Sequence, residues 1–198
     1  YFTQKAQSRA VMGWSNNSAT THLYRRVRNA DNEDFKNNYV DEIGRSIHPY
    51  DVNIPVENAY YNQYEKINDD FRNRITGFAK LTYDFNDFLT AFVRVGSDQL
   101  SHKIEQITPK GGSISNDGSR SDSYYDQTEV NADFLLMFNK HVGADFNLSL
   151  NAGGNYRFNK NETSTKSGEN FIIPNSQLYT NLADLRAGTE SLFRSSIY

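Results

Sequence analysis

Two long stretches of alternating apolar and polar residues constrain the fold of this chain more than any other feature. In the first stretch, residues 74–100, the odd positions from Ile75 to Tyr83 and from Leu89 to Val95 are apolar or glycine. The even positions between them are mostly polar, with Phe78 as an exception in the first run. A period of two indicates a β-strand, because successive side chains point to opposite faces. The residues DFND at 84–87 are typical of a tight turn, so we predict a hairpin over residues 74–100.

The same pattern returns in residues 124–159. Even positions from Val130 to Phe138 and from Leu148 to Phe158 are apolar or glycine, and the odd positions are mostly polar. The connection KHVGAD at 140–145 is short. Each predicted strand has about ten residues or more, which exceeds the usual length in soluble sheets and approaches what a tilted strand needs to cross a bilayer.

Alternation of this kind fits a soluble sandwich, whose apolar face meets a second sheet, or a membrane barrel, whose apolar face meets lipid. The aromatic residues favour the barrel, because they flank the aliphatic band at both ends, as the two interfaces of a bilayer select. Those near the tight turns are Tyr83, Phe85, Phe88 and Phe146, and those at the far ends are Tyr124, Tyr125, Tyr156 and Phe158. We therefore predict an all-β fold, a segment of an antiparallel transmembrane β-barrel with long extracellular loops and short periplasmic turns.

The expected organisation divides the chain at the loops. Residues 101–123 and 160–190 are predicted as long extracellular loops, and residues 191–198 as the start of the next strand. Residues 1–70 are expected to hold a strand near residues 1–11, a helical turn near residues 20–28 and a further long extracellular loop. The first residues, YFTQKAQSRAV, lack an initiator Met and the layout of a signal peptide, so we expect the segment to begin inside a longer chain.

Composition and motifs argue against several other functions. A net charge of -3 disfavours a nucleic-acid-binding surface. The absence of cysteine removes disulfides, thiolate metal sites and cysteine nucleophiles. The four histidines lack zinc-type spacing, no G-x-S-x-G occurs, and the oxygen-rich residues 29–35 and 115–122 lack the ligand order of an EF-hand. Asp69 and Asp70 are neighbours on an extended chain and therefore point apart. We predict no enzymatic activity, no metal site and no cofactor.

Several motifs follow one another in a recognisable order. Residues 58–61 read NAYY, residues 69–74 DDFRNR, residues 77–89 GFAKLTYDFNDFL and residues 94–98 RVGSD. In the second hairpin, NADFL at 131–135 precedes GGNY at 153–156. This succession resembles the central barrel region of SusC/RagA-type TonB-dependent outer-membrane transporters, over residues 18–194 and more weakly before residue 58. Ala59 stands where that family often has Pro, and Phe88 where it often has Trp.

The resemblance implies a multi-pass protein of the outer membrane that imports a bulky nutrient such as an oligosaccharide or a peptide. The implied partners are the lipid bilayer, a SusD-like surface lipoprotein, and the TonB complex, which would act through regions outside this chain. One alternative is a soluble extracellular β-sandwich that binds glycans through surface tyrosines. A secreted hydrolase is a third hypothesis, disfavoured by the missing catalytic constellation.

Two groups of residues are candidates for binding the solute. Tyr60, Tyr61 and Tyr64 carry flat rings with polar tips, which suit sugars and peptides, although packing in an aromatic belt or a loop is the simpler explanation. The inward-facing residues of the second group could line the path of the solute, or could form ion pairs in the lumen. They are Arg94, Asp98 and Arg157.

Overall fold

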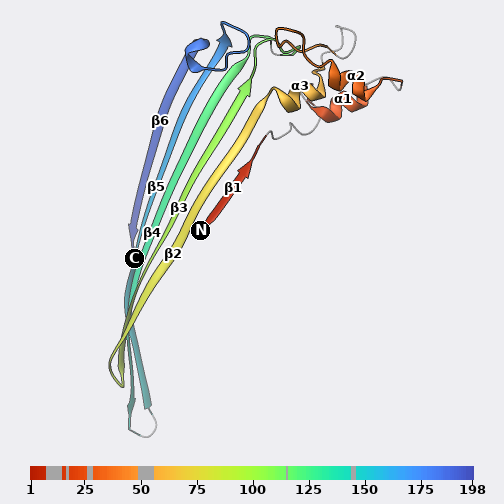
Figure 1. Cartoon of the computed structure of the whole chain (residues 1–198). Helices are drawn as coiled ribbons and strands as arrows, with labels where there is room; N and C mark the ends of the chain where they lie inside the picture. The colour runs from red at the N-terminus through yellow and green to blue at the C-terminus, as the bar shows by residue number, and fades with distance from the viewer. Residues whose placement is uncertain (8–14, 17, 26–28, 49–55, 115, 144–145) are drawn as a thin grey trace.

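The structure is a computed structural model that describes residues 1–7, 15–16, 18–25, 29–48, 56–114, 116–143 and 146–198. Six strands form one antiparallel sheet in sequence order, so the predicted all-β fold is confirmed and the sheet is open, with β1 and β6 at its edges. The strands are β1 (Phe2–Ala6), β2 (Ile67–Asn86), β3 (Leu89–Thr108), β4 (Ser119–Val142), β5 (Phe146–Phe171) and β6 (Leu182–Ile197). Three short helices, α1 (Ala19–Arg25), α2 (Asn32–Asn37) and α3 (Ala59–Tyr64), gather beside one end of the sheet, called here the upper end (Figure 1).

Strand register places the predicted alternating residues on one face. Leu81 of β2 lies opposite Val93 of β3, Val93 lies opposite Phe134 of β4, and Phe134 lies opposite Gly154 of β5. The apolar face is defined by the residues in register with these, namely Ile75, Gly77, Ala79, Leu81, Tyr83, Leu89, Ala91, Val93, Val95, Val130, Ala132, Phe134, Leu136, Phe138, Leu148, Leu150, Ala152, Gly154, Tyr156 and Phe158. The opposite face is called the polar face. Both predicted hairpins are therefore present.

The strands run further toward the upper end than the sequence pattern predicts. β3 continues to Thr108 and β4 begins at Ser119, so the predicted loop over 101–123 is wrong in extent and shrinks to residues 109–118. The loop predicted over 160–190 likewise shrinks to residues 172–181, because β5 and β6 extend into it. In these extensions polar residues occupy both faces, which removes the alternation. Cross-strand contacts hold them instead, such as Arg120 Nη2 to Glu105 Oε1 at 2.8 Å.

The lower end of the sheet has tight connections, as expected. Asp87 and Phe88 alone separate β2 from β3, and the Asn86 side chain accepts a hydrogen bond of 3.1 Å from the backbone N–H of Phe88. The turn predicted at 140–145 is shorter than we predicted, since β4 continues to Val142 and β5 begins at Phe146; Gly143 follows β4 with a φ of 73°. Residues 144–145 of that turn lie outside the described residues.

The first seventy residues contain more regular structure than we predicted. The strand expected near residues 1–11 is β1, and the expected helical turn is α1, with residues 8–11 and 26–28 of these predictions lying outside the described residues. Helices α2 and α3 were not predicted. Each begins after a side-chain cap, Asp31 Oδ1 accepting from Glu33 N and Asn58 Oδ1 from Tyr60 N, both at 3.0 Å.

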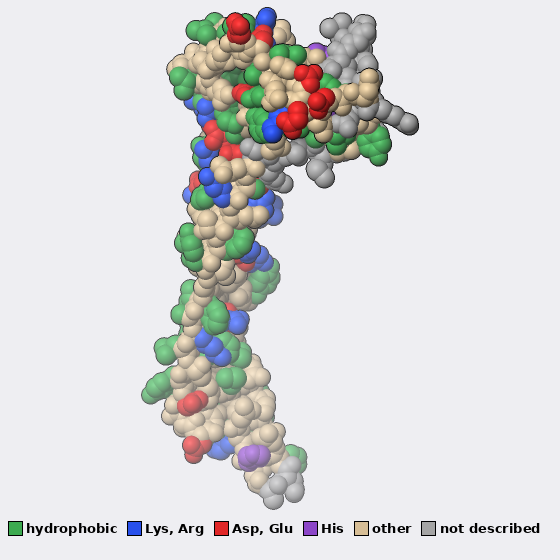
Figure 2. Space-filling view, turned by 45° about the vertical axis from the view of Figure 1, so that its right-hand side comes forward, with side chains coloured by type: hydrophobic (Ala, Val, Ile, Leu, Met, Phe, Trp, Pro, Cys, Tyr) green, Lys and Arg blue, Asp and Glu red, His purple; other side chains and the backbone are tan. Residues whose placement is uncertain are grey.

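Buried apolar side chains are few and lie at the upper end. Among the described residues they are Val56, Tyr61, Ile107, Phe171 and Leu182. The lower part of the sheet has no such core: Leu81 is 74% exposed and Phe134 56% exposed. Figure 2 shows this part as a narrow stem below a broad head. The stem is the part of the sheet that carries the apolar face, and the head comprises the three helices, the upper strand ends and the loops 109–118 and 172–181. Every described strand belongs to the one sheet. The described part of the chain contains no helix long and apolar enough to span a membrane.

Candidate functional site

Six charged residues of the stem form ion pairs on the polar face. Lys140, opposite Leu148, lies on the apolar side at the lower end, with its Nζ 5.1 Å from the centre of the Phe88 ring. Arg94 Nε lies 3.0 Å from Asp133 Oδ1, and Arg157 Nη2 lies 2.9 Å from Glu129 Oε2. Asp98 pairs with Arg74 and also accepts a hydrogen bond of 2.9 Å from Thr76 Oγ1. The three charged residues that we singled out from the sequence therefore occupy three separate ion pairs.

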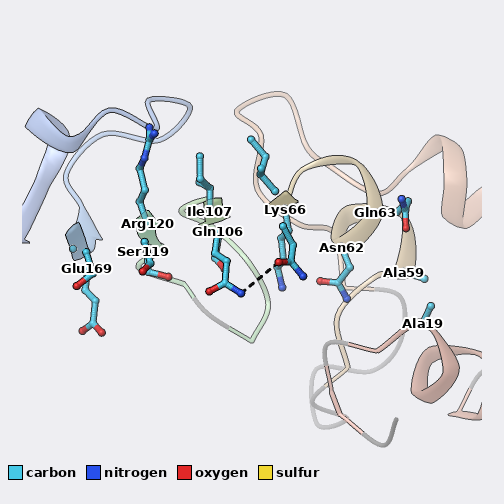
Figure 3. A pocket seen from close by; sticks show the side chains of 16 residues that line it. Ala19, Ala59, Asn62, Gln63, Lys66, Gln106, Ile107, Ser119, Arg120 and Glu169 are labelled. Atoms are coloured by element: carbon cyan, nitrogen blue, oxygen red, sulfur yellow. Dashed lines mark hydrogen bonds between the residues drawn. The ribbon is translucent and has the colours of Figure 1, made fainter. Parts of the chain in front are cut away.

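A cavity of about 340 Å³ lies at the upper end, between the helices and the polar face (Figure 3). From the helices, α1 contributes Ala19, and α3 contributes Ala59, Asn62 and Gln63. The polar face contributes amides and hydroxyls, Asn68, Gln106, Ser121 and Ser167. The dashed line in Figure 3 marks a hydrogen bond of 3.4 Å from Gln106 Nε2 to Asn68 Oδ1.

The chemistry of this cavity suits a polar solute. Amides and hydroxyls each donate and accept hydrogen bonds, so they match hydroxyl groups of sugars and backbone groups of peptides. Charged side chains also line it, namely Lys66, Arg120 and Glu169. Arg120 is already engaged, because its Nη2 also contacts Asp122 Oδ2 at 3.1 Å. Amide and hydroxyl groups are the most numerous hydrogen-bonding groups in the lining.

Glu57 holds the head together around this cavity. Its carboxylate is fully buried, accepts hydrogen bonds from Ser46 Oγ at 2.5 Å and from the backbone N–H of Ser113 at 3.2 Å, and lies 3.6 Å from Lys66 Nζ. Burial lowers the pKa of the Lys66 ammonium below its ordinary value, and the charge of Glu57 opposes that shift. The loop at 109–118, the start of β2 and the segment before α3 therefore meet at one carboxylate.

The three candidate tyrosines separate on α3. Tyr61 is fully buried, with Lys66 Nζ 5.8 Å from its ring centre, and burial raises the pKa of its phenol. The ring centres of Tyr60 and Tyr64 are 5.9 Å apart with the ring planes tilted by 34°, and Tyr64 also meets Tyr39 edge-on at 5.5 Å. None of the three lines the cavity, because Asn62 and Gln63 occupy the side of the helix that faces it.

Sequence reasoning missed the residues that do line the cavity. Asn62 and Gln63 lie between the candidate residues Tyr61 and Tyr64 in the sequence. We expected this part of the chain to be an irregular loop and therefore did not consider which side chains share a helix face. The signal was the N-cap Asn58 followed by a helical spacing, since positions 59, 62 and 63 then share one side of the helix. Asn68 and Gln106 fall in strand extensions that the alternation did not reveal.

One predicted belt residue lies on the other face. Tyr124 is on the apolar face, beside Lys103. Tyr125 is on the polar face, where its ring centre lies 5.6 Å from that of His102. His102 Nε2 in turn contacts Asp70 Oδ1 at 2.7 Å. Membership of Tyr125 in the upper aromatic belt was therefore wrong, because neighbours in a strand point to opposite faces.

Comparison with known proteins gives no indication of the function of this chain. Neither a protein-family model nor a curated protein sequence matches this chain. In the described residues, no three His, Asp or Glu side chains are grouped so that they could hold a metal ion. The cavity over the polar face is the candidate site, because amide and hydroxyl groups from α3 and four strands converge on it.

Proposed function

We propose that this chain forms part of the β-barrel of a SusC/RagA-like, TonB-dependent importer in the outer membrane. The observation that carries the proposal is the apolar face of the stem. In the described stretches 75–83, 89–97, 130–138 and 148–158, every residue on that face is uncharged, and Ser97 alone is polar. A surface of this size and composition, exposed along its length, fits lipid.

The dimensions of the apolar face agree with a bilayer. On β5 the apolar row runs without interruption at every second residue from Phe146 to Phe158. At about 3.3 Å per residue this row is roughly 40 Å long, which a strand tilt of about 40° reduces to about 30 Å. The hydrocarbon core of a bilayer has a similar thickness, about 30 Å.

The ion pair at the level of the middle of the apolar row lies on the opposite, polar face of the sheet. Arg94 and Asp133 lie level with Val93 and Phe134 but on the opposite face, and they pair with one another. A water-filled or plugged lumen tolerates such pairs, whereas lipid does not. The helices α1 and α3 extend over this polar face, so the cavity lies where a solute would enter the barrel from outside.

The open edges of the stem also support a barrel. In the described residues, β1 pairs with β2 only from Asp70 to Arg74, which leaves the outer edge of β2 unpaired toward the lower end. The edge of β5 below Asn155 is unpaired in the same way. Unpaired backbone groups are not tolerated in hydrocarbon, so further strands of a closed barrel would have to cover both edges.

In this proposal the protein binds an oligosaccharide or a peptide at the cavity under a SusD-like lipoprotein, and TonB supplies the energy for import. The chain itself carries out no bond chemistry. A soluble glycan-binding sandwich would require a second sheet against the apolar face, and the six described strands form one sheet.

Fractionation of cells that make the protein tests the location. We expect the chain in the outer-membrane fraction, released only by detergent; a chain that is soluble without detergent would overturn the proposal and favour the sandwich. The binding site is tested by calorimetry with a panel of oligosaccharides and peptides. We expect Asn62→Ala combined with Gln106→Ala to weaken binding about tenfold or more, since each lost buried hydrogen bond costs about 1 kcal/mol or more. Asn151→Ala, at the far end of the polar face, is the control and should bind as the unaltered protein does.

A further inference from the structure

A row of alternating lysine and aromatic residues crosses the sheet just above the apolar band. In strand register, Lys5 of β1 lies opposite Phe71 of β2, Phe71 lies opposite Lys103 of β3, and Lys103 lies opposite Tyr124 of β4. Phe71 lies four residues above Ile75 on the same strand. Residues separated by an even number share a face of the sheet, so all four side chains lie on the same face as the apolar row. We propose that this row binds the phosphate of an anionic lipid headgroup in the outer leaflet, an inference that rests on the membrane location proposed above.

The height of the row fits a headgroup. Four residues separate Phe71 from Ile75, which is roughly 13 Å along the strand and about 10 Å above the hydrocarbon edge after a tilt of about 40°. Headgroups occupy this layer, and aromatic rings with lysine are the side chains that settle there. A lipid whose acyl chains lie on the apolar face below would bring its phosphate to this level.

The row also forms a recess. Lys5, Phe71 and Lys103 line a hollow of about 300 Å³ on the surface of the sheet, together with Asp69, Asp70 and Glu105. Phe71 is 38% exposed and Tyr124 42% exposed, so both rings present a surface to a neighbouring molecule. Lys103 Nζ lies 5.8 Å from the ring centre of Tyr124, which holds the ammonium beside the ring.

Three carboxylates line the recess beside the two lysines. Asp70 belongs to the polar face, where its Oδ1 lies 2.7 Å from His102 Nε2, so Asp69 and Glu105 are the carboxylates on the face of the row. Asp69 and Glu105 stand two residues further up their strands than Phe71 and Lys103, so a headgroup that approaches from the bilayer reaches the ammonium groups first. Glu105 is shared between Lys103 Nζ at 3.1 Å and Arg120 Nη2 at 2.8 Å. An ammonium group has three N–H donors, and the contact with Glu105 uses one of those of Lys103.

A second pair repeats the arrangement on the neighbouring strands. Lys160 of β5 lies opposite Phe193 of β6, with its Nζ 5.5 Å from the ring centre, and both lie on the apolar side of the sheet. Lys160 also contacts Glu162 Oε2 at 2.7 Å. In strand register Lys160 is level with Ile75, four residues below the row, so this pair lies at the hydrocarbon edge, beneath the proposed phosphate site.

Lipid retention tests this inference. The protein is reconstituted in vesicles of equimolar phosphatidylglycerol and phosphatidylcholine, extracted in mild detergent, and the lipid that stays bound is measured by mass spectrometry. We expect phosphatidylglycerol to be enriched, and Lys5→Gln or Lys103→Gln to reduce the enrichment about fivefold each. Lys80→Gln is the matched control, because Lys80 lies on the polar face of β2 over the Phe92 ring at 4.3 Å, and it should leave the ratio unchanged.

Three outcomes would overturn the inference: equal retention of the two lipids, no effect of either lysine variant, or an equal effect of Lys80→Gln. A further arm adds excess inorganic phosphate. If free phosphate displaces phosphatidylglycerol completely, the row is a phosphate site rather than a lipid site. Failure of the unaltered protein to insert into vesicles of phosphatidylcholine alone contradicts the proposed function, whereas insertion without enrichment contradicts only this inference.

Discussion

Asp98 of β3 lies directly opposite Glu129 of β4 on the polar face. Like charges in this position repel and destabilise a sheet. Each carboxylate is balanced by an arginine from the strand on its other side, Arg74 of β2 and Arg157 of β5. Four strands thus contribute to one band of alternating charge at the top of the stem, and this arrangement is stable only where the band faces water or other polar groups.

Removal of one arginine should expose the repulsion between the two carboxylates. We expect Arg157→Gln to lower the free energy of unfolding in detergent by about 0.5–1 kcal/mol, because exposed ion pairs contribute about that much. Urea titration measures the change. Adding Glu129→Gln to Arg157→Gln should restore part of the loss, and high salt should shrink it. A double variant that is less stable than Arg157→Gln would contradict the assigned pairing.

Two neighbouring leucines on β4 distinguish the two faces of the sheet. Leu136 belongs to the apolar face and Leu135 to the polar face, opposite Gly153. We expect Leu136→Arg to destabilise the protein in lipid by about 2–4 kcal/mol, the cost of a lipid-facing arginine near the bilayer centre. Leu135→Arg introduces the same side chain one residue away and should cost far less. Equal costs in a urea titration of the protein in vesicles would show that the faces do not differ in this way.

Gly118 fixes the turn between β3 and β4. Its φ is +70°, and a Cβ atom there would lie 2.8 Å from the Thr108 carbonyl oxygen and 2.6 Å from Phe171 Cδ2. We expect Gly118→Ala to destabilise the head by about 1–3 kcal/mol and to increase hydrogen exchange at residues 109–118. Gly188→Ala on β6 is the control, since a Cβ atom there meets nothing within 4 Å. Unchanged exchange in Gly118→Ala would contradict the described turn.

Tyr179 should make the head sensitive to alkali. Burial raises the pKa of its phenol to about 12, with a further contribution from Asp122. An unfolded tyrosine titrates near pH 10, so above about that pH the unfolded chain loses a proton that the folded head keeps. The contribution of this group to stability is therefore complete below about pH 10 and is lost as the pH rises toward about 12.

Unfolding by urea at about pH 9 and about pH 11 measures this loss. We expect the fall in stability between the two values to be smaller in Tyr179→Phe than in the unaltered protein. The same fall in both proteins would mean that Tyr179 titrates alike in the folded and unfolded states.

The sequence was most informative where the two faces of a strand differ. From Ile75 to Val95 and from Val130 to Phe158, alternation predicted which residues share a face, and the strand register agrees. Above that level both faces are polar, so the strands up to Thr108 and Phe171 left no periodic signal. The aromatic belts were harder to read than the strands, since Tyr124 and Tyr125 are neighbours and only one of them can face lipid.

The candidate site could be predicted only in part. We expected binding residues near the long loops, among the tyrosines of α3, and the cavity at that end is lined by Asn62 and Gln63 of the same helix. Which side of a short helix faces a cavity depends on long-range contacts, here those of Glu57 with Ser46 and Ser113. Local patterns do not contain that information.

The central claim is that lipid covers the apolar face, and a nitroxide scan of β4 tests it most directly. The chain has no cysteine, so single cysteines at each position from 130 to 138 can be labelled without background. In vesicles, we expect labels at even positions to be accessible to oxygen in the hydrocarbon and labels at odd positions to be accessible to a water-soluble paramagnetic reagent. Accessibility without this alternation, or even positions shielded from both reagents as in a protein interior, would contradict the account.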